Sequence, residues 1–448
     1  MKFLVIGGDA AGMSAASRAK RNDKNMDVTV LERSHDVSYS ACGMPYNIAV
    51  PGKAIEDLVV RQARVFREKQ GIGLLTGHEV TAIDPAAKQV FGTTDQGASF
   101  EMAYDRLLIA TGGSAIVPAL PGFDLPGVMV LKSLDDGRRL KAYMEANGVR
   151  RVVIVGMGYI GLEMCEALVS RSVAVEMIKP GTGFLPWLGE PLSDVVQQEV
   201  ASKGVDLHIG CEVHRIEQRG PGLAVICDKG SLEADMVLVA VGLAPNSGIA
   251  GAAGLDLSVK KSIAVDRTLK TSHDDIYAAG DCADAYHVVT EQKTFIPLAL
   301  RANRAGWAVA DNILGAGVEL DGVAGTAVFK VFDLEVARTG LFPREAQLAG
   351  FDTVEVVIES RSRAHAHPGA MPIHVRMIAD RKTGRLLGVQ MVGKEGVAHR
   401  INAAAVALHN RMTVAAFSQT DLAYAPPFGP VWDPLLTAAT QLLKKIGG

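Results

Sequence analysis

Short apolar runs that end in glycine recur along the chain, and each predicts a strand buried in a parallel sheet. The first run, residues 1–6, is followed by a glycine loop, a helical pattern and a second strand at residues 28–31. The same order of strand, glycine loop, helix and strand begins again at Arg151. Each copy has the length of a βαβ unit, so the pattern predicts two Rossmann-like nucleotide-binding domains.

The segments that follow these two units complete the predicted fold. Buried-strand patterns that run into a glycine recur at residues 107–113, 236–242 and 276–281. Toward the C-terminus the pattern changes to strands at 354–358, 373–378 and 386–392 and an alanine-rich helix at 402–408. The predicted fold class is therefore α/β, with two Rossmann-like dinucleotide-binding domains and a C-terminal α+β domain.

Composition narrows the class of protein. The 448 residues carry 46 Lys plus Arg against 49 Asp plus Glu, a formal net charge of −3, without the excess of basic residues that nucleic acid or an anionic membrane attracts. No apolar run approaches the about 20 residues that cross a bilayer, and the N-terminal run is shorter than that of a signal peptide. The five cysteines are widely scattered and match neither a disulfide framework nor a zinc site. We therefore expect a cytoplasmic protein with no metal, no nucleic acid partner and no membrane partner.

The second glycine loop predicts a dinucleotide site. Gly156, Gly158 and Gly161 supply the tight turn, the approach of a pyrophosphate and the close packing of the helix. Lys179 stands where the second strand of this unit ends. A cation there favours the 2′-phosphate of NADPH over the 2′-hydroxyl of NADH, although a solvated lysine is the simpler alternative.

The first glycine loop has Asp9 where the second glycine would stand, and Glu32 at the end of the following strand strengthens its assignment. A carboxylate in that place accepts hydrogen bonds from a ribose diol, and the alternative is an ordinary charged strand end. Two dinucleotide sites imply a flavin and a nicotinamide that exchange a hydride. Gly280 and Asp281 suit an acidic loop near the ribityl or pyrophosphate group. Such a chain needs a third redox group.

Cys42 is the candidate for that group. The small residues around it leave its sulfur open, and a helix start or a bound cation could lower its pKa. Because no second cysteine lies nearby in the sequence, a disulfide with a sequence neighbour is excluded. Oxidation of Cys42 then gives a sulfenic acid or a mixed disulfide with a small thiol. The other cysteines are expected to be buried and structural: Cys165 in a helix, Cys211 and Cys227 in short strands, and Cys282 after Asp281.

Together these motifs resemble the single-cysteine flavoprotein disulfide reductases, a family that includes coenzyme A (CoA) disulfide reductase, the related persulfide reductases, NADH oxidase and NADH peroxidase. The resemblance covers essentially the whole chain. It is carried by both glycine loops, Ser38 with Cys42, Ala110-Thr111-Gly112, Gly280-Asp281 and Tyr424-Ala425-Pro426-Pro427-Phe428.

The resemblance implies an FAD domain interrupted by an NAD(P)H domain and followed by an interface domain that forms a homodimer. These domains would comprise residues 1–112 with 246–320, residues 113–245, and residues 321–448. Tyr159 would cover the flavin and swing aside for the nicotinamide. Tyr424 would reach the partner subunit's Cys42 and protonate a leaving thiolate, unless it is only a packed interface residue.

The motifs and the resemblance also imply the ligand contacts. For FAD these are Gly7, Gly8, Ala11, Gly12, Glu32, Arg33, Ser38, Val80, Thr111, Gly112, Tyr159, Gly280, Asp281, Pro297, Leu298 and Ala299. For NAD(P)H they are Gly156, Gly158, Tyr159, Ile160, Gly161, Glu163, Lys179 and Gly242. For CoA, a polyanion, they are Ser14, Arg18, Arg21, Ser38, Ala41, Cys42, Arg61 and Arg67, with a solvated helix face as the alternative for the basic residues.

Two departures from the family pattern bear on the substrate. Ala10 stands where the oxidases and the peroxidase carry a histidine, which removes the acid for peroxide chemistry. A second tyrosine of the CoA disulfide reductases is missing from the segment 363–369, where His365 and His367 stand nearby. Either histidine could replace that tyrosine, or both could be surface residues.

The sequence therefore predicts an NAD(P)H-dependent FAD enzyme that reduces CoA disulfide, or CoA persulfide or polysulfide, through a mixed disulfide between Cys42 and CoA. The alternative enzyme is a water-forming NADH oxidase that uses a Cys42 sulfenate. A flavin-bound thiol redox sensor is the alternative outside enzymes, although a nicotinamide site is superfluous in a passive sensor.

Overall fold

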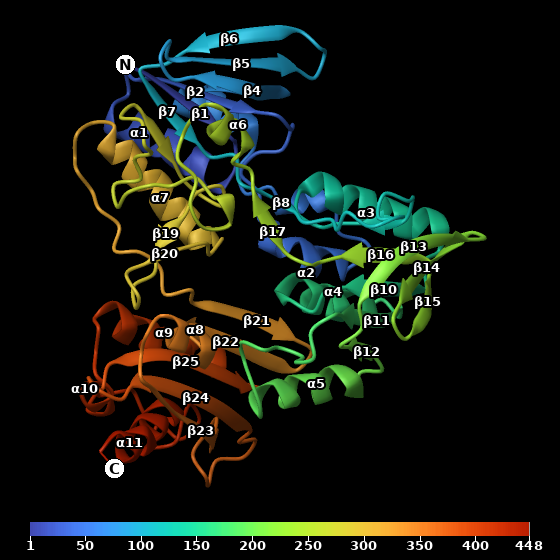
Figure 1. Cartoon of the computed structure of the whole chain (residues 1–448), viewed down its shortest axis with the longest axis vertical. Helices are drawn as coiled ribbons and strands as arrows, with labels where there is room; N and C mark the ends of the chain where they lie inside the picture. Colours follow the sequence, from blue (N-terminus) through green and yellow to red (C-terminus); the bar gives the residue numbers. More distant parts are fainter. Residues whose placement is uncertain (448) are drawn as a thin grey trace.

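The computed structural model describes residues 1–447, so Gly448, the end of the predicted interface domain, lies outside the described residues. Figure 1 shows one unit of strands and helices at the top that contains both the N-terminal segment and α7, a second unit at the right, and the C-terminal unit at the bottom. Three five-stranded sheets organise these parts.

The first sheet is parallel and has the strand order β18-β7-β1-β2-β3. Its strands are apolar because both faces are covered, and helices α1 and α7 pack against each other beside it. The elements of the sheet and these helices are β1 (Lys2–Ile6), α1 (Ala10–Asn22), β2 (Asp27–Glu32), β3 (Gly73–Thr76), β7 (Arg106–Ile109), β18 (Ile276–Ala278) and α7 (Ala299–Asn312). The other elements of this unit are η3 (Val65–Lys69), β4 (His78–Asp84), β5 (Gln89–Thr94), β6 (Ser99–Ala103), α6 (Gly248–Ala252), η4 (Val259–Lys261), β19 (Ala285–Tyr286) and β20 (Lys293–Thr294). After β2 the chain also forms η1 (Ala41–Gly43), α2 (Met44–Ile48) and η2 (Ile55–Leu58), and of these α2 and η2 pack on helices of the second unit.

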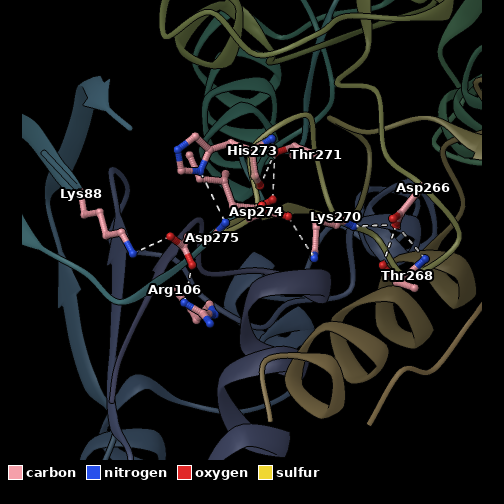
Figure 2. Close-up of polar contacts among 10 residues, drawn as sticks. Lys88, Arg106, Asp266, Thr268, Lys270, Thr271, His273, Asp274 and Asp275 are labelled. Carbon is pink, nitrogen blue, oxygen red and sulfur yellow. Dashed lines mark hydrogen bonds and ion pairs between the residues drawn. The ribbon is translucent and has the colours of Figure 1, made fainter. Parts of the chain in front are cut away.

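An ionic contact secures the late strand β18 in this sheet. The Asp275 carboxylate lies between the Lys88 ammonium and the Arg106 guanidinium (Figure 2), and these cations hold its pKa below the ordinary value. Lys88 precedes β5 and Arg106 begins β7. The contact therefore joins three segments that are distant in sequence. In the preceding turn, Asp266 accepts from the backbone N–H groups of Thr268 and Lys270 (Figure 2).

The second sheet, also parallel, has the order β12-β11-β10-β16-β9. In each unit a small antiparallel three-stranded sheet is inserted between strands of the parallel sheet: β4-β5-β6 between β3 and β7, and β13-β14-β15 between β12 and β16. The elements of the second unit are β9 (Val128–Met129), α3 (Leu134–Asn147), β10 (Arg151–Val155), α4 (Tyr159–Val169), β11 (Ala174–Lys179), α5 (Leu192–Ser202), β12 (Asp206–Ile209), β13 (Val213–Arg219), β14 (Gly222–Cys227), β15 (Gly230–Ala234) and β16 (Met236–Val239). The expectation that Cys211 lies in a strand is wrong, since it lies in the turn between β12 and β13.

The chain passes between these units twice, at β8 (Gly113–Ala115) and β17 (Leu243–Pro245), which pair with each other. The predicted boundaries after residues 112 and 245 fall at this crossing. The division into domains, with its third boundary after residue 320, remains our proposal.

The third sheet is antiparallel, in the order β21-β22-β25-β24-β23. Helices α9 and α11 pack on it and bury an apolar core of their own. The elements are β21 (Ala327–Val331), β22 (Leu334–Gly340), α8 (Pro343–Leu348), β23 (Thr353–Arg361), β24 (Pro372–Asp380), β25 (Leu386–Gly393), α9 (Val397–His409), α10 (Val414–Ser418) and α11 (Pro434–Ile446). The α/β class with a C-terminal α+β unit is confirmed. None of the helices in residues 1–447 is long and apolar enough to cross a membrane.

Candidate active site

The first glycine loop lies between β1 and α1, and its geometry requires the absence of side chains. Gly7 has φ +112°, and a Cβ added to it would meet the Ala110 carbonyl oxygen at 2.1 Å. A Cβ on Gly12 would meet the Gly7 carbonyl oxygen at 1.9 Å. The loop therefore packs tightly on the end of β7, and α1 begins directly against it.

The Glu32 carboxylate holds this loop from the end of β2. One carboxylate oxygen accepts from the Gly8 backbone N–H at 2.7 Å. The other accepts from the backbone N–H and the hydroxyl of Ser34, both at 2.8 Å. Ser38 also joins the loop, because its backbone N–H donates to the Gly8 carbonyl at 3.1 Å. Glu32, the predicted acceptor for the ribose diol, is thus hydrogen-bonded to the first glycine loop.

Charged groups gather around the N-terminus of α1. Asp9 occupies the N-cap position, and burial raises the pKa of its carboxyl group to about 6. The Lys132 ammonium lies 3.1 Å from an Asp281 carboxylate oxygen, and its charge acts on Asp9 as well. Sequence reasoning missed Lys132, which lies 149 residues from its partner and belongs to no motif.

This donor set fits a flavin dinucleotide. The N-terminus of α1 and the Lys132 ammonium favour a pyrophosphate, and Glu32 offers an acceptor for a ribose diol. Gly280 has φ +86° and lies against Ala11, so the predicted acidic loop closes over the start of α1.

The remaining predicted FAD contacts are more widely spread. Thr111 and Asn246 exchange two hydrogen bonds, and the neighbouring Gly112 has φ +68°. The segment Pro297 to Ala299 leads into α7. Arg33 is exposed after β2, whereas Val80 is buried in β4.

The second glycine loop repeats the geometry of the first. Gly156 has φ +112°, and a Cβ on it would meet the Ala240 carbonyl oxygen at 2.3 Å. A Cβ on Gly161 would meet the Gly156 carbonyl oxygen at 2.6 Å. Around Gly158 a Cβ would find open space, which fits the approach of a pyrophosphate.

Lys179, the last residue of β11, is not free. Its ammonium group donates to the carbonyl oxygens of Gly183 and Phe184, and burial lowers its pKa. Gly242 follows β16 with φ +139°, and Ile160 is exposed at the start of α4. The predicted contact of Lys179 with a 2′-phosphate stays a prediction.

Tyr159 begins α4 and lies in an aromatic cluster. Its ring centroid is 4.9 Å from that of Phe329 in β21 and 5.7 Å from that of Trp187. Burial raises the pKa of its hydroxyl, and the nearby Arg338 acts in the opposite direction. The cluster joins the second unit to the C-terminal unit, and the predicted cover of the flavin by Tyr159 stays a prediction.

Cys42 lies in the short turn η1, immediately before α2. It is exposed, whereas the other four described cysteines are buried. The protein groups around Cys42 do not lower the pKa of its thiol: partial burial raises this pKa, the Glu163 charge adds to the rise, and Lys132 opposes it. A lowering by a bound cation stays a prediction. The segment before Cys42 is bonded to the first glycine loop, since the Tyr39 backbone N–H donates to the Asp9 carboxylate at 3.3 Å. The Asp281 and Asp9 charges also act on the thiol.

Glu163 connects Cys42 to the second glycine loop. It lies in α4, and its carboxylate accepts from the Tyr46 hydroxyl of α2 at 2.8 Å. Burial raises the pKa of Glu163. The two nucleotide loops and Cys42 therefore meet where α2 packs on α4.

The predicted CoA contacts lie mostly on α1. Arg18 pairs with Asp311 through two hydrogen bonds of 2.9 and 3.0 Å, and the Ser14 hydroxyl donates to Asn303 at 2.6 Å. Arg61 and Arg67 are exposed, with Arg61 over the Phe66 ring and Arg67 donating to the Leu74 carbonyl. Arg21 is exposed on α1, and Ala41 adjoins Cys42.

Tyr424 belongs to the C-terminal unit, between α10 and α11, and is 49% exposed. Figure 1 shows these helices at the opposite end of the chain from α1 and the first glycine loop. The loop of His365 and His367 is joined to the tyrosine loop, since the Ala364 backbone N–H donates to the Pro426 carbonyl at 3.0 Å. The histidines and Tyr424 thus occupy neighbouring loops.

Two family models match the chain. The pyridine nucleotide-disulphide oxidoreductase model matches residues 1–306, and the dimerisation domain model of the same family matches residues 326–434. The chain belongs to the pyridine nucleotide-disulphide oxidoreductase family. It is an oxidoreductase that uses FAD and NAD(P)H, and it carries the domain through which the family dimerises.

Several relatives are similar over nearly the whole length. The "NAD(P)H sulfur oxidoreductase (CoA-dependent)" of Pyrococcus abyssi is 40% identical, over 98% of this chain and 97% of the relative. An "NADH oxidase" of Methanocaldococcus jannaschii is 32% identical, over 100% and 99%. A "Coenzyme A disulfide reductase" of Staphylococcus aureus is 30% identical, over 95% and 96%.

A solved structure confirms the arrangement of the units. The NAD-dependent persulfide reductase of A. fulgidus superposes with a TM-score of 0.96 at 34% identity, over 100% of this chain and 84% of that one. Within the described part of the chain, no group of three or more His, Cys, Asp or Glu side chains is placed to hold a metal ion.

Proposed function

We propose that this oxidoreductase reduces CoA disulfide, or CoA persulfide or polysulfide, through a mixed disulfide between Cys42 and CoA. The observation that carries the proposal is that Cys42 is exposed at the flavin-binding loops while the other four described cysteines are buried. A single accessible thiol forms its disulfide with a substrate thiol. The names of the relatives at 38–40% identity, all CoA-dependent sulfur or persulfide reductases, support CoA as that thiol.

The chemistry balances with Cys42 as the nucleophile. The Cys42 thiolate attacks one sulfur of CoA disulfide, so that a Cys42–S–S–CoA bond forms, the substrate S–S bond breaks and one CoA thiolate leaves. Bound FAD supplies two electrons from NAD(P)H, which cleave the mixed disulfide. This step returns the Cys42 thiolate and releases the second CoA, which takes a proton.

We infer that the proton donor comes from the partner subunit. Tyr424 is exposed on the dimerisation domain, on a loop bonded to the loop of His365 and His367. In a homodimer this surface would complete the site at the Cys42 of the other subunit, with the tyrosine hydroxyl or a histidine as the acid. A reducing cytoplasm, which keeps an exposed thiol reduced, is the location we propose.

Cys42→Ser tests the proposal. We expect this variant to keep FAD and to be reduced by NAD(P)H at the native rate, but to form no free CoA from CoA disulfide. Cys227→Ala, which removes a buried thiol of the second unit, is the matched control and should retain turnover. Continued CoA formation by Cys42→Ser would contradict the proposal.

A water-forming NADH oxidase is the second candidate, supported by the Methanocaldococcus relative. In that reaction oxygen would take two electrons from one NADH, by way of bound FAD, and form hydrogen peroxide. The peroxide would oxidise the Cys42 thiolate to a sulfenate with release of one water, and a second NADH would reduce the sulfenate to the thiolate with release of the second water. Oxygen consumption that matches NADH oxidation without any CoA compound would favour it. The passive redox sensor is set aside, because the chain belongs to a family of oxidoreductases.

A further inference from the structure

Helices α1 and α7 form a polar surface that runs away from the flavin loops. The two helices lie side by side (Figure 1), and both begin at predicted FAD contacts. Gly306 permits their close approach, since a Cβ there would meet the Ala11 carbonyl oxygen at 2.3 Å. Along the seam the Ser14 hydroxyl donates to Asn303, and two turns further Asn22 donates to Asp311 at 2.7 Å.

Trp307 lies in the middle of this surface with 47% of its area exposed. The Arg18 guanidinium lies over its ring, 5.7 Å from the ring centroid. Asp311 holds that guanidinium with two hydrogen bonds, so Arg18 is fixed in place beside Trp307. An exposed tryptophan beside a fixed arginine is a suitable surface for stacking a nucleobase.

The charge around Trp307 favours an anion. Arg21 acts on Asp311 and helps to lower the pKa of that carboxyl, while Arg304 is exposed one turn before Trp307 on α7. Arg18 and Arg21 thus act on the single carboxylate of Asp311, and Arg304 adds a further exposed cation on α7. Lys20 takes no part, since its ammonium group donates to the carbonyl oxygens of Lys24 and Met26.

The position along α1 matches a long ligand whose sulfur is at Cys42. Asp9, at the N-cap of α1, is among the charges that act on the Cys42 thiol. Arg18 lies nine residues further, about 14 Å along the helix axis at 1.5 Å per residue. CoA carries its thiol and its phosphorylated adenosine at opposite ends of an extended pantetheine arm.

We infer that Trp307, with the Arg18 guanidinium held over it by Asp311, is the stacking surface for the adenine base of CoA. The inference rests on the proposed function and adds the residue that distinguishes CoA from smaller thiols. Arg21 and Arg304 attract the phosphates of the same nucleotide, and Arg18 acts through its paired position rather than as a free phosphate ligand.

The test compares CoA disulfide with pantethine, the disulfide of the same pantetheine arm without the nucleotide. We expect Trp307→Ala to lower the ratio of kcat/KM for CoA disulfide to that for pantethine by about tenfold, the loss expected when one stacked base loses its aromatic partner. Trp307→Phe should keep most of the ratio. Leu314→Ala, at another exposed apolar side chain just beyond α7, is the control and should have the native ratio.

Each other outcome is decisive. A native ratio in Trp307→Ala, or an equal fall for both substrates, overturns the inference. A shift of Trp307→Ala from dimer to monomer in light scattering also overturns it, because the residue would then contact a second copy. If the native enzyme reduces neither disulfide while calorimetry shows weaker binding of free CoA to Trp307→Ala, the proposed function fails and the nucleotide site stands. If such an enzyme and its Trp307→Ala variant bind free CoA equally, both the proposed function and the inference fail.

Discussion

The Glu32 carboxylate is the group whose removal should most clearly disturb the first glycine loop. In Glu32→Ala the backbone N–H groups of Gly8 and Ser34 lose the acceptor that now lies 2.7 and 2.8 Å away. The Ser34 hydroxyl is less affected, because it also donates to the Asp36 carbonyl. A hydrogen bond to a charged group contributes about 1.5–3 kcal/mol, and the lower end applies to this half-buried side chain. Two lost bonds therefore cost about 3 kcal/mol.

The cost should appear in two measurements. Flavin-free Glu32→Ala should be about 3 kcal/mol less stable to urea. Its Kd for FAD, followed by the quenching of flavin fluorescence, should rise at least about tenfold, because the ribose diol also loses its predicted acceptor. Glu32→Gln keeps one acceptor oxygen and should lie between the two proteins. Glu79→Ala, at an exposed glutamate in β4, should behave as native.

Native FAD affinity in Glu32→Ala, together with a stability change of less than about 0.5 kcal/mol, the size typical of surface substitutions, would refute this reasoning. Such a result would mean that the loop keeps its shape without the carboxylate and that the ribose is bound elsewhere.

Three further outcomes follow from the geometry of the two loops. Gly156→Ala places a Cβ 2.3 Å from a carbonyl oxygen, so anaerobic stopped-flow spectroscopy should find a protein with bound FAD that NAD(P)H no longer reduces rapidly. The folded pKa of Asp9, about 6, exceeds its ordinary value near 4, so folding favours the protonated form and the native protein loses stability as pH rises from 4 to 6. By pH 7 the native protein should have lost about 3 kcal/mol of its free energy of unfolding in this way, and Asp9→Asn should show no such loss. Urea titrations of both proteins at the same flavin content measure the difference. Lys132→Met should raise the pKa of the Cys42 thiol, and Glu163→Gln should lower it. The pH dependence of labelling by iodoacetamide measures this pKa. Shifts in the same direction in the two variants would contradict the opposite effects of these two charges.

The parts of the fold that could be predicted from sequence are those with local, periodic patterns. The strands β1, β2 and β10 are continuous apolar runs, and α1 and α4 begin directly after glycine loops, so the two parallel units could be identified. The antiparallel sheets β4-β5-β6 and β13-β14-β15 were not predicted. Their strands are short, carry no motif and share no regular pattern: buried residues lie three apart in β4 and β13, alternate in β5 and are consecutive in β14.

The candidate site divides in the same way. The two glycine loops could be predicted, because each depends on a few adjacent residues of one βαβ unit. Glu32 was predicted as an acceptor for a ribose diol, but its hydrogen bond from the Gly8 backbone N–H was not. The contacts Lys132–Asp281, Tyr46–Glu163 and Arg18–Asp311 join residues more than 100 positions apart, so only the folded chain brings them together. The same holds for the Cys42 thiol, because its pKa is raised by burial in the folded chain and by the Glu163 charge, which comes from the second unit.

The most direct test of the central claim is the intact mass of the enzyme after incubation with CoA disulfide and acid quenching, with and without a thiol reductant. The account predicts one CoA-sized adduct per chain that maps to Cys42, disappears on reduction and is absent from Cys42→Ser. An enzyme that turns over CoA disulfide with no adduct, or with an adduct on another cysteine, would contradict the mixed disulfide at Cys42.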